Sequence, residues 1–218
     1  MLIDRHGVDG CRLYLEQLRW PAGVLCPRCE SSDVHWLERR RRHNCRQCRY
    51  QFRVTAGTVF HDSHLSLRKW FVAVQLMLDS ERGTSALQLS ELLGGSYKSA
   101  WFLEHRIRSA MARTAQFGDL VAYAGAVPPH GEPAGRPIAR DGGQQALRSW
   151  PILKSLIAGA HRNVGVKYLS AYWNEVHWRD SNRTNPNAFR DTVLALLEHP
   201  WLPYDELTGA VEPAASTA

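Results

Sequence analysis

Apolar residues recur at helical spacing in three consecutive stretches between residues 65 and 113. The spacing predicts a helix in LSLRKWFVAVQLMLDS, a short helix from Thr84 that Gly94 and Gly95 stop, and a longer helix that Ser96 caps. A helix, a glycine turn and a longer helix together make the helix-turn-helix pattern. The apolar positions of the first two helices are Trp70, Val74, Met77 and Leu78, then Leu87, Leu89, Leu92 and Leu93. In the third helix, Ala100, Leu103, Ile107 and Ala110 or Met111 are expected to line a core face.

Two more helices are predicted after a segment of a different composition. Residues 122–143 contain 14 Gly, Pro or Ala among 22, which is typical of a linker. VKYLSAYWNEVHW then has a broad aromatic face, and Asn185-Pro186 is a good start for a helix in NAFRDTVLALLEH. The apolar positions of the two helices are Tyr168, Leu169, Tyr172, Trp173 and Val176, then Phe189, Val193, Leu196 and Leu197.

Four of the five cysteines form two CxxC pairs, Cys26 with Cys29 and Cys45 with Cys48, separated by fifteen residues. This spacing is typical of a tetrahedral four-cysteine zinc site, because each tight turn aims two sulfurs at one ion. Redox pairs are the alternative, but a redox CxxC needs only one pair. The fifth cysteine, Cys11, lies in a helix-like stretch and is predicted to be a small buried hydrophobe.

Between the pairs, SSDVHWLERRRRHNC reads as a turn, a strand, a basic turn and a returning strand, as in a zinc ribbon. On a strand, Arg39 and Arg41 would share one face and Arg40 and Arg42 the other. Such a hairpin could straddle a phosphate backbone, and the alternative is a solvated turn that protects an edge strand. From residue 39 to 53 there is no acid and there are seven arginines: Arg39, Arg40, Arg41, Arg42, Arg46, Arg49 and Arg53.

The charge of the chain is concentrated in its first half. Residues 1–113 carry 18 Lys and Arg against 11 Asp and Glu, a net charge of +7, and the rest carry 9 against 10, or −1. Nucleic acid is the expected acidic partner of a basic surface there. No apolar run approaches the roughly 18 to 20 residues that span a bilayer, and no secretory signal is recognisable, so we expect a cytoplasmic, nucleoid-associated protein without a membrane partner.

The third predicted helix is the candidate recognition helix, whose N-terminal residues would contact base edges. Its residues further along would contact phosphates, and these include Arg108. The alternative is that Trp101 and Phe102 belong to a core and that the three helices form a protein interface. The predicted DNA-contacting residues are Ser96, Tyr97, Lys98, Ser99, Trp101, Phe102, His105 and Arg106.

The run from Leu18 to Arg113 closely resembles the N-terminal half of bacterial insertion-sequence transposases. The resemblance rests on LRWPAGVLCPRCESS, on the second cysteine pair followed by YQFRVTAGTVFHDSHLSLRKWF, and on SALQLSELLGGSYKSAWFLEHRIRSAM. It implies a zinc ribbon and a helix-turn-helix that bind the terminal repeats of the element. It also implies an RNase H-like catalytic domain of the DDE type, in which three acids hold two magnesium ions.

The expected acids are missing where the resemblance would place them. GDLVAYAGAVPP stands where the family has its first acid, and Leu147 lies near the position of the last one. About one hundred residues of catalytic domain are absent between the two matching parts. The remaining carboxylates, which show no spacing that would converge on a metal, are Asp119, Glu132, Asp141, Glu175 and Asp180.

We therefore predict a mainly α fold with a small β zinc ribbon, one structural zinc ion and no assigned catalytic residue. The function predicted is recognition of double-stranded DNA at element ends without strand transfer, with no small-molecule substrate. The alternatives are an active DDE transposase that needs magnesium, or a zinc ribbon that binds proteins. The C-terminal helices, without a sheet to cover, are expected to dock on the helix-turn-helix or to form a homodimer interface.

The predicted organisation has five segments. They are an N-terminal helix (1–24), a zinc ribbon (25–61), a helix-turn-helix (62–113), a linker (114–149) and a C-terminal helical remnant of the catalytic domain (150–218).

Overall fold

The computed structural model describes residues 3–80, 83–112, 151–157 and 165–209. This part of the chain is mostly helical with one small three-stranded antiparallel sheet, which confirms the predicted fold class. The predicted linker lies outside the described residues.

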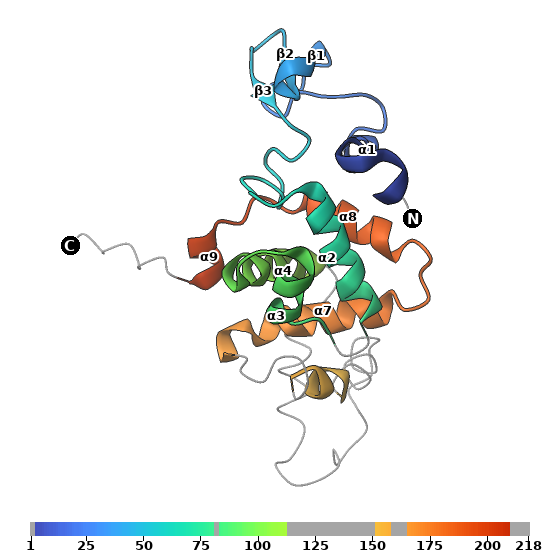
Figure 1. The fold of residues 1–218 in the computed structure, drawn as a ribbon. Helices are drawn as coiled ribbons and strands as arrows, with labels where there is room; N and C mark the ends of the chain where they lie inside the picture. Colours follow the sequence, from blue (N-terminus) through green and yellow to red (C-terminus); the bar gives the residue numbers. More distant parts are fainter. Residues whose placement is uncertain (1–2, 81–82, 113–150, 158–164, 210–218) are drawn as a thin grey trace, which may run out of the picture. The chain divides into compact units, whose positions relative to one another are not determined.

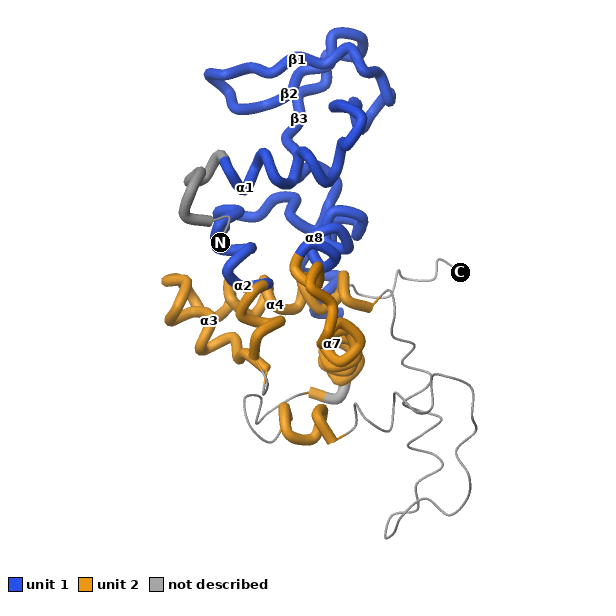
Figure 2. Tube along the Cα trace, turned by 90° about the vertical axis from the view of Figure 1, so that its right-hand side faces the viewer, with its two compact units in different colours: residues 1–74, 190–218 blue, residues 75–189 orange. Residues whose placement is uncertain are grey.

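The chain divides into two compact units, residues 1–74 with 190–218 and residues 75–189 (Figure 2). These units differ from the predicted segments, since α2 (Leu67–Asp79) and α8 (Ala188–Glu198) each contribute to both.

Unit 1 contains the N-terminal helix, the sheet and a short C-terminal helix. The strands follow the order β1-β2-β3, and both pairings are antiparallel (Figure 1). The strands are short because the chain turns sharply after each cysteine pair and after β1. The elements are α1 (Ile3–Arg19), β1 (Val34–Leu37), the 3₁₀ turn η1 (Glu38–Arg40), β2 (Arg42–Cys45), β3 (Gln51–Phe52) and α9 (Tyr204–Thr208).

One face of the sheet packs into a small core. Phe52 is buried with two of the cysteines, and Trp20 at the end of α1 packs against this cluster. Arg19 ties the same end of α1 to the chain after β3, because its guanidinium donates to the carbonyl oxygens of Val54 and Ala56. Cys11 is buried in α1, as predicted.

The first predicted helix of the helix-turn-helix segment is α2. Trp70 and Val74 are buried, and the Trp70 ring nitrogen donates to the Ser63 hydroxyl at 2.9 Å. Met77 is also buried, whereas Leu78 is half-buried at the edge of the helix face. The predicted helix is thus confirmed, and three of the four apolar residues named in it are buried.

Helix α3 (Ala86–Leu93) begins two residues later than predicted. Ser85 is the cap and forms a capping box with Gln88, while the Thr84 hydroxyl donates to the Leu76 carbonyl. Of the apolar residues named in this helix, Leu89 is buried, whereas Leu87 is 57% and Leu92 66% exposed. A helix of two turns buries a single stripe, and Leu87 and Leu92 lie outside that stripe.

Helix α4 (Tyr97–Met111) packs against α3 and against α7 (Leu169–Ser181). The Ser96 hydroxyl accepts from the Ser99 amide at 3.1 Å, which confirms the predicted cap. The predicted core residues Ala100, Leu103, Ile107, Ala110 and Met111 are all buried. All residues from 103 to 108 are buried, so α4 is enclosed on every side over more than one turn.

A buried ion-pair network joins α4 to α7. Arg108 Nε donates to Glu175 at 2.6 Å, and Arg108 also donates to Glu104 at 3.1 Å. The guanidinium lies 4.1 Å from the ring centre of Tyr172, and Arg179 is 3.5 Å from the other oxygen of Glu175. Burial opposes the charge of Arg108, but the two carboxylates more than offset it, so its pKa is raised.

The aromatic face of α7 is covered in unit 2. Tyr172, Trp173 and Val176 are buried with Leu153 and Leu156 of the helical residues 151–157. Packing of α7 on α4 agrees with the prediction that a C-terminal helix docks on the helix-turn-helix segment. The homodimer interface stays a prediction.

The second C-terminal helix, α8, starts at Ala188 rather than at Pro186. Asn185 still shapes its start, because its side-chain oxygen accepts from the Asn187 amide at 2.8 Å. The predicted apolar residues Val193, Leu196 and Leu197 are buried, and Phe189 is half-buried.

Replacing Arg108 by Ala should strongly destabilise the protein, because it leaves two carboxylates buried without their cation. Removing one partner of a buried pair costs about 3 to 5 kcal/mol of unfolding free energy. Urea unfolding would measure the change, with Arg183→Ala, an exposed arginine, as the matched control. A loss below about 1 kcal/mol would contradict the network described.

The stability of the protein should also depend on Glu104. Burial raises the pKa of Glu104 to about 7, with Glu175 adding to the shift and Arg108 opposing it. Because the folded pKa exceeds the unfolded value of 4.5, this contribution to stability is present below about pH 4.5 and is lost as the pH rises through about 7.

A Glu104→Gln variant tests this, since the amide cannot titrate. The unfolding free energy of the wild type should fall by about 3 kcal/mol relative to the variant between pH 4.5 and pH 8. Parallel pH profiles for the two proteins would show that Glu104 titrates normally.

Candidate zinc centre and basic hairpin

The four paired cysteines converge in the structure. The sulfurs of Cys26, Cys29, Cys45 and Cys48 all lie within 4.8 Å of one another, and the Cys26–Cys48 and Cys29–Cys45 sulfur distances are both 3.6 Å. Four thiolates around a tetrahedral zinc ion, each about 2.3 Å from the metal, have sulfurs about 3.8 Å apart. The donor set and its geometry therefore fit zinc.

Each cysteine pair is held by the same local geometry. Glu30 and Arg49, which directly follow the second cysteine of each pair, both have a φ of 58°. The left-handed residue turns the chain back, and backbone bonds then close each turn: the Cys26 amide donates to Ser31, and the Cys45 amide to Tyr50, both at 3.0 Å. The two turns thus present their sulfurs on the same side.

Backbone amides favour negative charge on two of the sulfurs. The Ser31 backbone N–H does so at Cys29, but burial and the neighbouring thiols raise the pKa of that thiol to about 12. The Cys48 backbone N–H hydrogen-bonds the Cys45 sulfur and, against the effect of burial, lowers the pKa of that thiol to about 7. Cys26 and Cys45 are fully buried and the other two are half-buried, so the site is largely closed to water. A closed four-thiolate site is typical of structural zinc.

The arginines surround this centre on exposed positions. The predicted order of strand, basic turn and return strand is confirmed, since Glu38–Arg40 form a 3₁₀ turn, Arg41 is left-handed with a φ of 49°, and Arg42 begins the return strand. The alternate strand faces that the arginines would have on a strand are not found, because Arg39, Arg40 and Arg41 lie in the turn. Four successive side chains therefore spread around one tight turn rather than over two strand faces. Arg39, Arg40, Arg41, Arg42, Arg46, Arg49 and Arg53 are all exposed.

Helix α1 stabilises the hairpin through side-chain contacts that were not predicted from the sequence. The Glu16 carboxylate is 3.0 Å from His43 Nε2 on β2 and accepts from Arg12 at 2.8 Å. Arg12 in turn lies 4.3 Å from the ring centre of Trp36 on β1. Burial raises the pKa of Glu16, but the bonds from His43 and Arg12 more than offset it and lower that pKa. No signal in the sequence could have found the Glu16–His43 contact, because it joins residues that are distant along the chain.

The candidate recognition residues of α4 fall into three groups by their exposure. Ser96, Tyr97, Lys98 and Ser99 are exposed at the start of the helix. Trp101 and Phe102 are half-buried, and Trp101 packs on His105 with ring centres 4.2 Å apart. His105 is 1% and Arg106 2% exposed, which leaves neither of them a surface for a base or a phosphate.

The carboxylates singled out in the sequence do not gather among the described residues. Glu175 is buried in the ion-pair network with Arg108, and Asp180 is half-buried further along α7. Asp119, Glu132 and Asp141 lie outside the described residues. Of the two that the structure describes, Glu175 is the fully buried one, and the Arg108 network occupies it.

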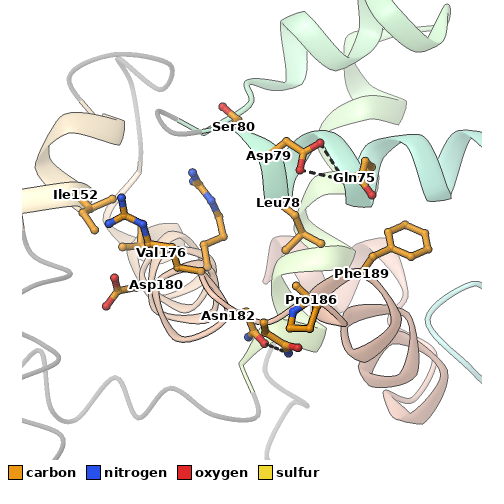
Figure 3. A pocket seen from close by; sticks show the side chains of 14 residues that line it. Gln75, Leu78, Asp79, Ser80, Ile152, Val176, Asp180, Asn182, Pro186 and Phe189 are labelled. Atoms are coloured by element: carbon orange, nitrogen blue, oxygen red, sulfur yellow. Dashed lines mark hydrogen bonds between the residues drawn. The ribbon is translucent and has the colours of Figure 1, made fainter. Parts of the chain in front are cut away.

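A pocket of about 650 Å³ opens in unit 2 between the end of α2 and the turn before α8 (Figure 3). Leu78, Val176 and Phe189 form its apolar side, and polar side chains that line it bond to one another. The Gln75 amide donates to Asp79, and the Asn185 amide donates to Asn182 (Figure 3). These paired groups do not form a set of donors directed at a ligand.

No helix in the part of the chain that the structure describes is long and apolar enough to cross a membrane.

Comparisons with known proteins agree with the cysteine geometry. Residues 9–51 match the transposase zinc-ribbon domain. Over 100 residues the chain is 36% identical to an uncharacterized protein in transposable element ISH50 of Halobacterium salinarum, which covers 44% of this chain and 33% of that protein. No solved structure matches the chain.

The chain thus spans about a third of the length of the curated relative that it matches. The zinc-ribbon match, the mobile-element relative and the four convergent cysteines together support a zinc-binding protein that is related to transposases.

Proposed function

We propose that this chain is a transposase-derived DNA-binding protein. It recognises the ends of a mobile element through its zinc ribbon and helix-turn-helix, and it does not carry out strand transfer. The observation that carries the proposal is the cluster of seven exposed arginines on a ribbon held by four convergent cysteines.

The basic hairpin, residues 34–45, carries its positive charge on a folded scaffold, which favours contact with a phosphate backbone. Its one acid, Glu38, accepts from the Trp36 ring nitrogen at 2.5 Å. Arginines held on a folded scaffold lose less conformational freedom when they bind than arginines on a mobile tail. Each phosphate contact would release counterions, so binding should be steeply dependent on salt.

The helix-turn-helix part of the proposal rests on α3, the Gly94-Gly95 turn and α4. Only the first turn of α4 is accessible, so Ser96, Tyr97, Lys98 and Ser99 are the residues that we assign to DNA. Base contacts from the N-terminal turn agree with the way recognition helices enter a groove. His105 and Arg106 are left out because they pack against neighbouring side chains instead.

The proposal that strand transfer is absent rests on the missing acids. Two-metal chemistry needs converging carboxylates that can reach solvent and substrate. Glu175, the acid of α7 that could have served, is fully buried and bonded to Arg108 at 2.6 Å. Magnesium-dependent nicking of element-end DNA by the purified chain would contradict this part of the proposal.

One structural zinc ion per chain should be necessary for the ribbon. Cys29→Ser or Cys45→Ser should lose the metal and unfold residues 25–55, because the stability of such a small sheet is mostly zinc-binding energy. The circular dichroism signal of α2, α3 and α4 should be largely retained. Native mass spectrometry would count the zinc, and Cys11→Ser, which changes a cysteine outside the cluster, is the matched control.

Binding to DNA should depend on the arginine turn. Arg39→Ala and Arg41→Ala should each weaken binding to all duplexes and reduce the slope of log affinity against log salt by about 1. Gel shifts on element-end and scrambled duplexes at several salt concentrations measure both effects. Arg183→Ala, an exposed arginine of unit 2, should leave the slope unchanged.

If the protein binds element-end DNA no better than scrambled DNA, the proposed recognition is wrong. Weak binding that does not respond to salt would favour a zinc ribbon that serves a protein partner.

A further inference from the structure

The strand register separates the two faces of the small sheet. Directly paired residues of antiparallel strands share a face, and successive residues alternate. Val34 pairs with Cys45, Trp36 with His43, and His43 with Phe52. These five side chains therefore point to the cysteine cluster and to α1, where the Glu16–His43 contact closes that face.

The other face carries a different set of side chains. His35 pairs with Asn44, and Asn44 with Gln51, so these three residues form a polar row across all three strands. Leu37 and Arg42 form the neighbouring pair towards the basic turn. Arg42 is exposed, and the other four side chains are half-buried. We call this surface, residues 35, 37, 42, 44 and 51, the open face.

A hydrogen bond on the open face fixes the direction of one amide. Arg40 donates to the Gln51 side-chain oxygen at 3.2 Å. A guanidinium can only donate, so the Gln51 oxygen is turned towards Arg40 and its NH₂ group is turned away. Arg40 and Gln51 together then offer hydrogen-bond donors to a ligand, because the amide NH₂ is turned away from Arg40 and the guanidinium has further N–H groups.

Two hydrogen-bond donors side by side match the major-groove edge of guanine. This edge presents two acceptors, N7 and O6, whereas adenine presents one acceptor and one donor. The major groove, about 12 Å wide, admits a two-stranded β-ribbon, and the minor groove, about 6 Å wide, is too narrow for it. The exposed arginines of the adjoining turn, residues 39–42, would then lie near the phosphates at the groove edge.

We propose that the open face of the sheet reads sequence in the major groove, with the Arg40–Gln51 pair donating to N7 and O6 of a guanine. Asn44, whose amide offers one donor group and one acceptor, is paired with Gln51 across the strands and would contact the neighbouring base pair. This inference rests on the proposed function, and it assigns base reading to the ribbon as well as to α4.

The test uses the zinc-loaded full chain and element-end duplexes that carry modified guanines. Replacing guanine by 7-deazaguanine removes N7 from the major groove without changing base pairing. This should weaken binding about 5- to 100-fold, the range that corresponds to one bidentate base contact. Inosine, which lacks the amino group of guanine in the minor groove, should leave the affinity unchanged.

Two variants of Gln51 and a control variant of Gln17 connect the effect of 7-deazaguanine to Gln51. Gln51→Ala should bind the normal and the 7-deazaguanine duplexes equally, whereas Gln17→Ala, an exposed glutamine on α1, should keep the difference. Gln51→Glu keeps an oxygen for Arg40 but removes the donors, so it should lose its preference for guanine while retaining zinc. The zinc content of each variant shows whether the ribbon is folded.

The outcomes distinguish the inference from the proposed function. Absence of specific binding to unmodified element-end DNA would mean that the proposed function itself is wrong. Specific binding that is insensitive to 7-deazaguanine, or that is lost with inosine instead, would overturn the major-groove assignment and leave DNA recognition standing. Retained discrimination in a zinc-loaded Gln51→Glu variant would overturn the role of Gln51.

Discussion

The convergence of four cysteine sulfurs is the constraint on which the ribbon depends. Strands of two to four residues bury too little apolar surface to fold by themselves, and the two cysteine turns set where each strand starts or ends. The position of the cysteines fixes the register of β1 on β2, since Val34 and Cys45 are paired beside the cluster. The basic turn and the open face both follow from that register.

Helix α1 adds a second support that is made of side chains. Glu16 connects to His43 on the strand that ends at Cys45, and Arg19 connects to the chain beyond β3. One face of the sheet is thereby covered, and the arginines are left on the uncovered parts. The chain thus separates the residues that hold the ribbon together from those that are available to an acidic partner.

Unit 2 is organised by a different interaction, the buried contact of Arg108 with Glu104 and Glu175. A buried ion pair adds little stability compared with apolar packing, but it penalises any arrangement in which one partner is missing. It therefore specifies how α7 lies on α4. The same packing encloses α4 after its first turn, so its fully exposed residues are those at its start, residues 96–99.

Local sequence signals were sufficient to predict the features that depend on residues close together in the chain. The CxxC spacing, the Ser96 cap and the apolar spacing of α4 all predicted what the structure contains. Periodicity located the apolar residues of α3 but did not say which of them meet a neighbour, and Leu87 and Leu92 are exposed. The basic turn was predicted, but the alternate faces of its arginines were not found, because successive side chains spread around a tight turn.

Burial of His105 and Arg106, and the Glu16–His43 contact, could not be predicted for a similar reason. They depend on helices and strands that are distant in sequence, and polar residues carry no periodic signal of such partners. The pairing of Asn44 with Gln51 likewise required the register, since a slip of one residue would move both amides to the covered face.

The most direct test of the account is to remove zinc with a chelator while measuring zinc content and affinity for element-end DNA in the same samples. The account predicts that both fall together and that both return when zinc is added back, because the metal holds the surface that binds. Undiminished DNA affinity in a protein that has lost all its zinc would contradict it.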